Sequence, residues 1–250
     1  SAAIAAAGAT PVLSGTSTVA EAVAALATNA AITFTLSDTA ANLALAPTSV
    51  FVNAASVTAT GVTTAVQATQ IETIITAANG TRAVALAAGT VTYNVTDTAS
   101  NVANYQSALG LADSVTTTGQ STVAQTAATN LLTGSVYSTT DTAGALNTAA
   151  GGAAAAVAAL DNAAANTVSG AATVAQIDTI NTATSQDVES GYALSDLYAN
   201  LVTGTSTTLA KAATVTGSAG NITVSDAGLN VTQARTIEAL SNSGTNAYVV

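Results

Sequence analysis

Four aspartates at recurring positions are the residues of this chain with the clearest potential for chemistry: Asp38, Asp97, Asp141 and Asp196. Paired carboxylates can act as general acid and base, and clustered ones can bind a divalent cation. Here the four stand far apart in equivalent sequence contexts, so we expect them to be spaced along a row rather than gathered in one site. Each follows an alternating stretch and precedes a helical one, where Asp is a favoured N-cap. We therefore predict that these aspartates cap helices.

The remaining polar residues give no stronger catalytic signal. Asp187 and Glu189 are the only close acidic pair of this kind, and Lys211 is the only lysine. The chain has no Cys and no His, which excludes zinc sites, disulfides and Ser-His-Asp or Cys-His catalysis. Neither a calcium-binding loop nor a phosphate-binding glycine motif is present. We predict no enzymatic activity and no cofactor, and leave calcium binding at the surface open.

The composition and the net charge of the chain exclude two classes of binding partner and a membrane span. The 250 residues include 3 Lys and Arg against 13 Asp and Glu, which gives a formal net charge of -10. Such a chain has too few cations to neutralise phosphates, so we expect no binding to nucleic acid or anionic membranes. The mean hydropathy of +0.47 comes mostly from Ala and Val. A spanning helix needs roughly 20 strongly apolar residues, and no such stretch occurs, so we predict no membrane span.

Two patterns recur along the chain. The first is a capping box, a hydroxyl or amide residue followed three positions later by Glu or Gln. It occurs at residues 18–21, 64–67, 122–125, 173–176 and 230–233. A glycine lies three residues before each of the first four boxes, at Gly15, Gly61, Gly119 and Gly170. Apolar residues follow at helical spacing, so each box predicts the start of a helix.

The second pattern alternates apolar and polar residues and predicts strands buried on one face. It runs over residues 32–37 and 91–96, with looser copies at the segments that begin at 136 and 191. Shorter closing strands are predicted at 56–61, 114–119, 166–170 and 213–217, and a further one at 221–225. Strands that alternate with helices favour parallel pairing.

These patterns predict an α/β fold, a solenoid-like repeat stack of parallel strands and capped helices. About four repeats of roughly 50 residues are expected. The alternative is a single compact α/β parallel sheet. The predicted segments are an N-terminal cap (1–15), repeat 1 (16–61), repeat 2 (62–119), repeat 3 (120–170), repeat 4 with an insertion (171–228) and the start of an incomplete fifth repeat (229–250).

The chain resembles the repeat regions of large bacterial surface proteins, namely S-layer-like proteins, giant adhesins and extracellular filament subunits. The resemblance is carried by the Thr-Val-Ala-Gln boxes, the Val-Thr-x-Thr-Gly strands and the Asp-Thr-Ala-x-Asn segments. It implies a secreted, structural and self-assembling protein of the cell surface. Many members of these groups bind calcium, but this sequence has no recognisable calcium loop.

Two function classes follow. The leading prediction is a non-catalytic extracellular structural protein that assembles with itself into a surface layer or filament. The alternative is an adhesin or phage-fibre-type module whose Thr-rich sheet face contacts glycans. The C-terminal Tyr248, Val249 and Val250 are apolar and β-prone. We predict that residues 245–250 join a neighbouring copy head to tail, because a contact of this kind that does not close gives a filament.

Overall fold

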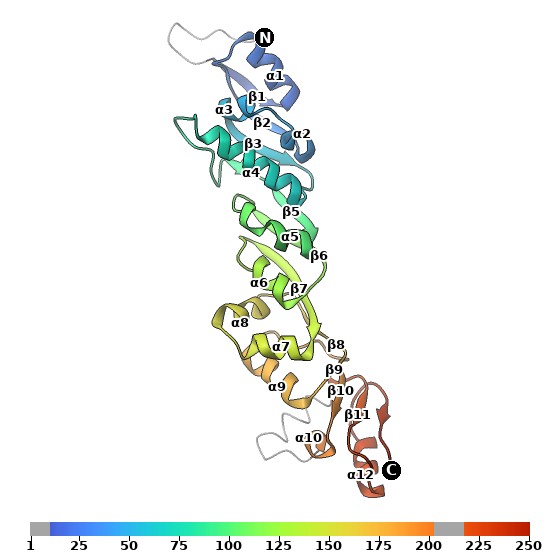
Figure 1. Cartoon of the computed structure of the whole chain (residues 1–250). Coiled ribbons are helices and arrows are strands. Elements are labelled where there is room, and N and C mark those ends of the chain that lie inside the picture. Colours follow the sequence, from blue (N-terminus) through green and yellow to red (C-terminus); the bar gives the residue numbers. More distant parts are fainter. Residues whose placement is uncertain (1–10, 203–217) are drawn as a thin grey trace. The chain divides into compact units, whose positions relative to one another are not determined.

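The computed structural model describes residues 11–202 and 218–250, and Figure 1 shows its helices and strands. The chain divides into two compact units of helices and parallel strands. The first unit falls within residues 1–118 and 131–136, and the second within residues 119–130 and 137–250. The predicted closing strand at 213–217 lies outside the described residues. The class of the fold is confirmed as mixed α/β with parallel strand pairs.

In the first unit the strands pair in their order along the chain. Strand β1 pairs with β2, β2 with β3 and β3 with β4, while β5 pairs with β6. Their bounds are β1 Val12–Ser17, β2 Thr33–Thr39, β3 Ala54–Thr60, β4 Val91–Thr92, β5 Asn94–Thr98 and β6 Ser114–Ser121. The helices between them are α1 Val19–Thr28, α2 Ala40–Ala44, α3 Thr48–Asn53, α4 Ala65–Asn79, α5 Ala99–Tyr105 and the 3₁₀ helix η1 Gln106–Ala108.

The core of the first unit joins one face of the strands to the helices. Phe34 and Leu36 of β2 are fully buried together with Ile71 of α4. The polar residues between them, Thr33 and Thr35, are only half-buried. This difference confirms the predicted alternation, and it arises because successive side chains of a strand point to opposite faces.

In the second unit β7 pairs with β8, and a second group pairs in the order β9, β10, β11 and β12. Their bounds are β7 Ser135–Thr142, β8 Asn166–Ser169, β9 Ala171–Ala172, β10 Ala193–Asp196, β11 Ile222–Val224 and β12 Asn246–Ala247. The helices are α6 Val123–Thr129, α7 Ala143–Ala150, α8 Ala154–Asp161, α9 Val174–Ala183, α10 Tyr198–Val202 and α12 Val231–Glu238. Leu146, Ile177, Ile180 and Ile222 are among the fully buried residues of its core.

All five predicted capping boxes are present with both of their hydrogen bonds, at the starts of α1, α4, α6, α9 and α12. The glycines that precede the first four boxes share a left-handed backbone, with φ of 85° at Gly15, 78° at Gly61, 77° at Gly119 and 79° at Gly170. An L side chain disfavours this conformation, which explains why glycine recurs three residues before each cap.

The structure differs from the prediction in two local respects. Residues 91–96 do not form one strand, because the pairing is interrupted at Tyr93 between β4 and β5. Short helices α3 and α8 follow α2 and α7, and the sequence analysis did not predict them. The boundaries of the individual repeats stay a prediction.

Candidate functional site

The four recurring aspartates join helix ends that are distant in sequence, as Asp97 illustrates. Its Oδ2 accepts a hydrogen bond of 2.9 Å from the backbone N–H of Ala65, the first residue of α4. Its Oδ1 accepts from the backbone N–H of Thr98 at 2.7 Å and from the side-chain amide of Asn101 at 2.8 Å. One carboxylate therefore binds the start of the preceding helix and the start of the following helix, α5.

The same arrangement recurs in both units, and we call Asp38, Asp97, Asp141 and Asp196 the bridging aspartates. In each, Oδ2 accepts from the first N–H of the preceding capping-box helix. The donors are Val19 for Asp38 at 2.9 Å, Ala65 for Asp97 at 2.9 Å, Val123 for Asp141 at 3.1 Å and Val174 for Asp196 at 3.0 Å. In each, Oδ1 accepts from the N–H of the next residue, and in all but Asp141 it also accepts from an Asn side chain four residues later.

The prediction that these aspartates are N-caps is wrong for Asp38, Asp97 and Asp141, because the structure gives α2, α5 and α7 a different N-cap residue. The following helices do begin two residues after Asp38, Asp97 and Asp141, but their N-caps are Thr39, Thr98 and Thr142. Each threonine hydroxyl accepts the N–H three residues ahead of it. The threonine takes the cap position, and this leaves the aspartate to bind the neighbouring helix.

The surroundings of Asp38 and Asp97 favour the charged carboxylate. Burial alone would raise the pKa of Asp38, but the hydrogen bonds from Asn42, Val19 and Thr39 outweigh burial and lower that pKa. The pKa of Asp97 is lowered in the same way. The partial positive charge of a helix N-terminus also favours an adjacent anion, and each bridging aspartate lies at two such ends.

This geometry assigns the aspartates a structural role. Their oxygens accept from N–H groups, so both are already engaged by hydrogen-bond donors. Within residues 11–202 and 218–250, no group of three or more His, Cys, Asp or Glu could hold a metal ion. Glu189 accepts from the hydroxyl of Thr167 at 3.2 Å, and Lys211 lies outside the described residues.

Two further carboxylates have roles that the sequence analysis missed. Asp226 accepts from the backbone N–H of Tyr198 at the start of α10, so a fifth aspartate binds a helix end. Glu72 of α4 accepts from the hydroxyl of Tyr93 and from the backbone N–H of Leu111 at 2.9 Å. Neither residue belongs to a repeated motif, and all three of their partners are remote in sequence, so no local pattern could have identified these roles.

The predicted assembly residues lie next to the last strand of the second unit. Tyr248 packs against the core, and a hydrogen bond between its hydroxyl and Glu238 raises its pKa. The carbonyl of Val249 accepts from the N–H of Leu229 at 2.7 Å. The side chains of Val249 and Val250 are 62% and 72% exposed. The predicted contact of these residues with another copy stays a prediction.

The strand order β1-β2-β3-β4 of the first unit and the order β12-β11-β10-β9 of the second each have an edge strand at both ends. In the first unit β1 pairs with β2 alone among the described strands, and in the second β12 pairs with β11 alone. The carbonyl of Pro11 accepts from Thr33 of β2 at 2.9 Å. The register between β1 and β2 shifts between Val12 and Thr16, and Ser14, which lies in this irregular stretch, has no register partner on β2. An edge of this kind can pair with another strand.

Hydroxyl side chains form rows across the sheet of the first unit. The register places Thr35 opposite Ser56, and Ser37 opposite Thr58, which in turn lies opposite Thr92. These side chains alternate with the buried apolar ones, so they belong to the other face of the sheet. Neighbouring strands lie about 4.8 Å apart, so the rows present regularly spaced hydroxyl groups.

Comparisons with protein families, with curated proteins and with solved structures found no match to this chain. In the described part of the chain, no single helix is both long and apolar enough to cross a membrane. Helices α7 and α8 are bent by 120° relative to each other. Only when taken together are they long and apolar enough to be a candidate membrane span.

Proposed function

We propose that this chain is a non-catalytic, extracellular structural protein that assembles with copies of itself into a layer or filament. The observation that carries the proposal is the pair of edge strands, β1 and β12, each paired on one side only among the described strands. Exposed edges favour pairing with another chain. Parallel addition of β12 of one copy to β1 of the next would extend the existing pattern of strands.

The order of strand types supports this head-to-tail contact. Strands β1, β3, β6 and β8 carry or precede a left-handed glycine, and we call them glycine strands. Strands β2, β5, β7 and β10 carry the bridging aspartates, and we call them aspartate strands. Glycine and aspartate strands are neighbours in the pairs β1–β2, β2–β3, β5–β6 and β7–β8.

Strand β12 follows the capping-box helix α12, which is the position of an aspartate strand in the repeat. Placing β1 of a second copy beside β12 would therefore put a glycine strand next to it, as within the chain. In this proposal the whole chain is a solenoid-like stack of about four repeats, and Tyr248, Val249 and Val250 lie at the contact with the next copy. A heterologous contact that does not close on itself produces a filament.

The composition supports a protein made in quantity and released from the cell. Cys and Met are absent, so the chain has neither of the sulfur side chains that oxidants attack. With 3 Lys and Arg among 250 residues, it offers few sites to trypsin-like proteases. The proposal assigns no catalytic role, since the recurring carboxylates already bind helix ends.

A second candidate function is adhesion to glycans. The rows that contain Thr35, Ser56, Thr58 and Thr92 favour it, because regularly spaced hydroxyl groups can both donate and accept hydrogen bonds. In this alternative the chain would act as a monomeric binding module of an adhesin or fibre.

One experiment separates the two functions. Sedimentation velocity over a wide concentration range measures the size of the chain in solution, and a glycan array measures sugar binding. Concentration-dependent polymers without glycan retention are expected for the structural protein. A monomer at every concentration that is retained on specific glycans would favour adhesion and would count against self-assembly.

A further inference from the structure

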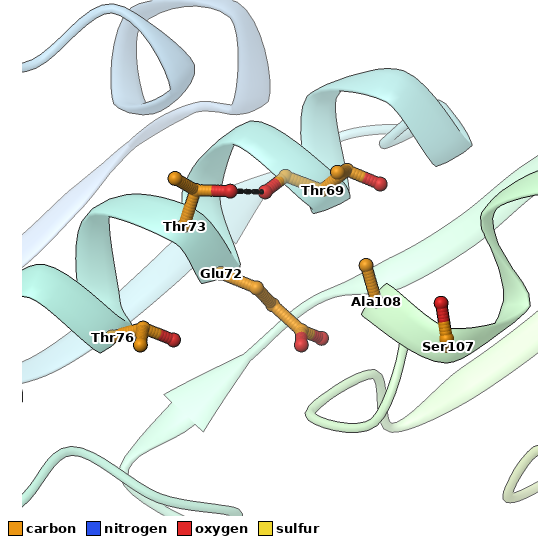
Figure 2. A pocket seen from close by; sticks show the side chains of 6 residues that line it. All are labelled: Thr69, Glu72, Thr73, Thr76, Ser107 and Ala108. Atoms are coloured by element: carbon orange, nitrogen blue, oxygen red, sulfur yellow. Dashed lines mark hydrogen bonds between the residues drawn. The ribbon is translucent and has the colours of Figure 1, made fainter.

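A pocket in the first unit contains Glu72 and plays no part in the proposed function. It has a volume of about 280 Å³ and opens between α4 and the segment that carries η1. Its lining consists of Thr69, Glu72, Thr73, Thr76, Ser107 and Ala108. Figure 2 shows the Glu72 carboxylate extending from α4 toward the segment with Ser107 and Ala108. The volume lies just below the usual range for sites of drug-sized ligands, so it suits a small molecule or one side chain.

Glu72 gives the pocket a carboxylate in which both hydrogen bonds are made by the same oxygen, Oε1. Its Oε1 accepts from both Tyr93 and Leu111, and this holds the side chain in a fixed, half-buried position. None of the described residues donates a hydrogen bond to Oε2, and none forms an ion pair with this carboxylate. Two donors therefore stabilise the negative charge of Glu72 at Oε1, while Oε2 can accept hydrogen bonds from a ligand in the pocket.

Two of the four hydroxyl groups that line the pocket can act toward it only as acceptors. Thr69 donates its hydroxyl proton to the carbonyl of Ala65 at 2.9 Å, and Thr73 donates to the carbonyl of Thr69 at 2.7 Å. Both hydroxyl protons are thus committed within α4, and what remains on each oxygen is the capacity to accept. The methyl groups of the threonines and of Ala108 supply a small apolar surface beside these acceptors.

We propose that the pocket formed by Glu72, Thr69, Thr73 and Ala108 binds a primary alkylammonium group, such as the end of a lysine side chain or of a polyamine. An ammonium carries three donors and no acceptor, which matches a carboxylate flanked by hydroxyl oxygens. Its alkyl stem would lie along the methyl groups.

Other classes of ligand fit the pocket less well. A calcium ion requires six to eight oxygen ligands, more than one carboxylate provides, and a neutral sugar would leave the charge of Glu72 uncompensated. The net charge of -10 also attracts cations to the chain.

The test is an NMR titration of the intact chain with n-butylammonium chloride, followed through the backbone amides of residues 69–76 and 106–111. Saturable shifts confined to these segments are expected. Neutral n-butanol has nearly the same shape without the charge, and tetramethylammonium has the charge without N–H donors. Both should produce much smaller shifts. Equal responses to n-butylammonium and n-butanol, or to calcium chloride or methyl glucoside in place of the amine, would overturn the proposal.

Two variants and one control assign the effect to the pocket. Glu72→Gln removes the charge but keeps a carbonyl oxygen for Tyr93 and Leu111, and it should weaken binding by about tenfold or more. Ala108→Leu fills the pocket without altering any charge and should abolish the shifts. Glu189→Gln makes the same change in net charge at an exposed position of the second unit and should leave binding unchanged. Binding that survives in both pocket variants would refute the assignment, and this outcome is independent of whether the chain assembles.

Discussion

Asp97 accepts a hydrogen bond of 2.9 Å from the backbone N–H of Ala65, although the two residues are 32 positions apart. The contact connects the end of β5 to the start of α4, and the same carboxylate binds the residues that begin α5. The same contact recurs at Asp38, Asp141 and Asp196. It fixes four of the five capping-box helices, α1, α4, α6 and α9, to a strand that comes later in the chain.

Replacing Asp97 by Asn is expected to destabilise the first unit by about 1–2 kcal/mol, because charge-assisted hydrogen bonds to two helix ends are weakened and an amide N–H₂ faces other donors. Chemical denaturation followed by circular dichroism measures the change. Asp187→Asn, which removes the same charge at an exposed position, serves as the control and should alter stability little. Equal stability of the two variants would contradict the structural role of Asp97.

The lowered pKa values of Asp38 and Asp97 predict how stability depends on pH. A carboxylate whose pKa is lower in the folded than in the unfolded chain stabilises the fold while it is ionised. This contribution is complete above the ordinary value of 3.8 and is lost as the pH falls through the lowered folded value. We expect the unfolding free energy to decline below about pH 4. The double variant Asp38→Asn, Asp97→Asn should show a shallower decline over that range, and an unchanged slope would argue against the assignment.

A substitution that adds a single methyl group, glycine to alanine, tests whether the left-handed backbone explains the repeated glycines. At Gly61, φ is 78° and an added Cβ would meet no atom within 4 Å, so Gly61→Ala isolates the cost of the backbone conformation. A loss of about 1–2 kcal/mol is expected. The matched control is Gly110→Ala, which also has open space around the added Cβ but no left-handed φ. It should be neutral or slightly stabilising, and a comparable loss in both variants would refute this explanation of the repeated glycine.

The capping boxes could be predicted because each is a local motif in which both partners lie within four residues. The alternating strand at 32–37 could also be predicted, since the period of two directly reflects which face is buried, and the closing strand at 56–61 was predicted as well. Pairing in parallel followed from the alternation of strands and helices. These features depend on neighbours in sequence, and the structure confirms them.

The role of the bridging aspartates could not be read in the same way. Asp and Thr are both favoured caps, and the doublet Asp97-Thr98 offers two candidates for one position. The choice between them is made by the preceding helix, whose first N–H lies 18–32 residues upstream of the aspartates. The pocket at Glu72 could not be predicted from the sequence for a related reason. Its acid stands alone in the sequence, and the opposite wall comes from Ser107 and Ala108.

Self-assembly through the sheet edges is tested most directly by Ser14→Pro, with Ser14→Ala as its matched control. Proline removes the backbone N–H of Ser14, which lies where the register between β1 and β2 shifts, and proline is tolerated on edge strands and at bulges. The fold should therefore survive in both variants, which circular dichroism would verify. Electron microscopy and sedimentation velocity of the two proteins at equal concentration then give the decisive comparison. Long assemblies for Ser14→Ala and only monomers for Ser14→Pro are expected, whereas equal assembly of both, or monomers for both, would contradict assembly through the β1 edge.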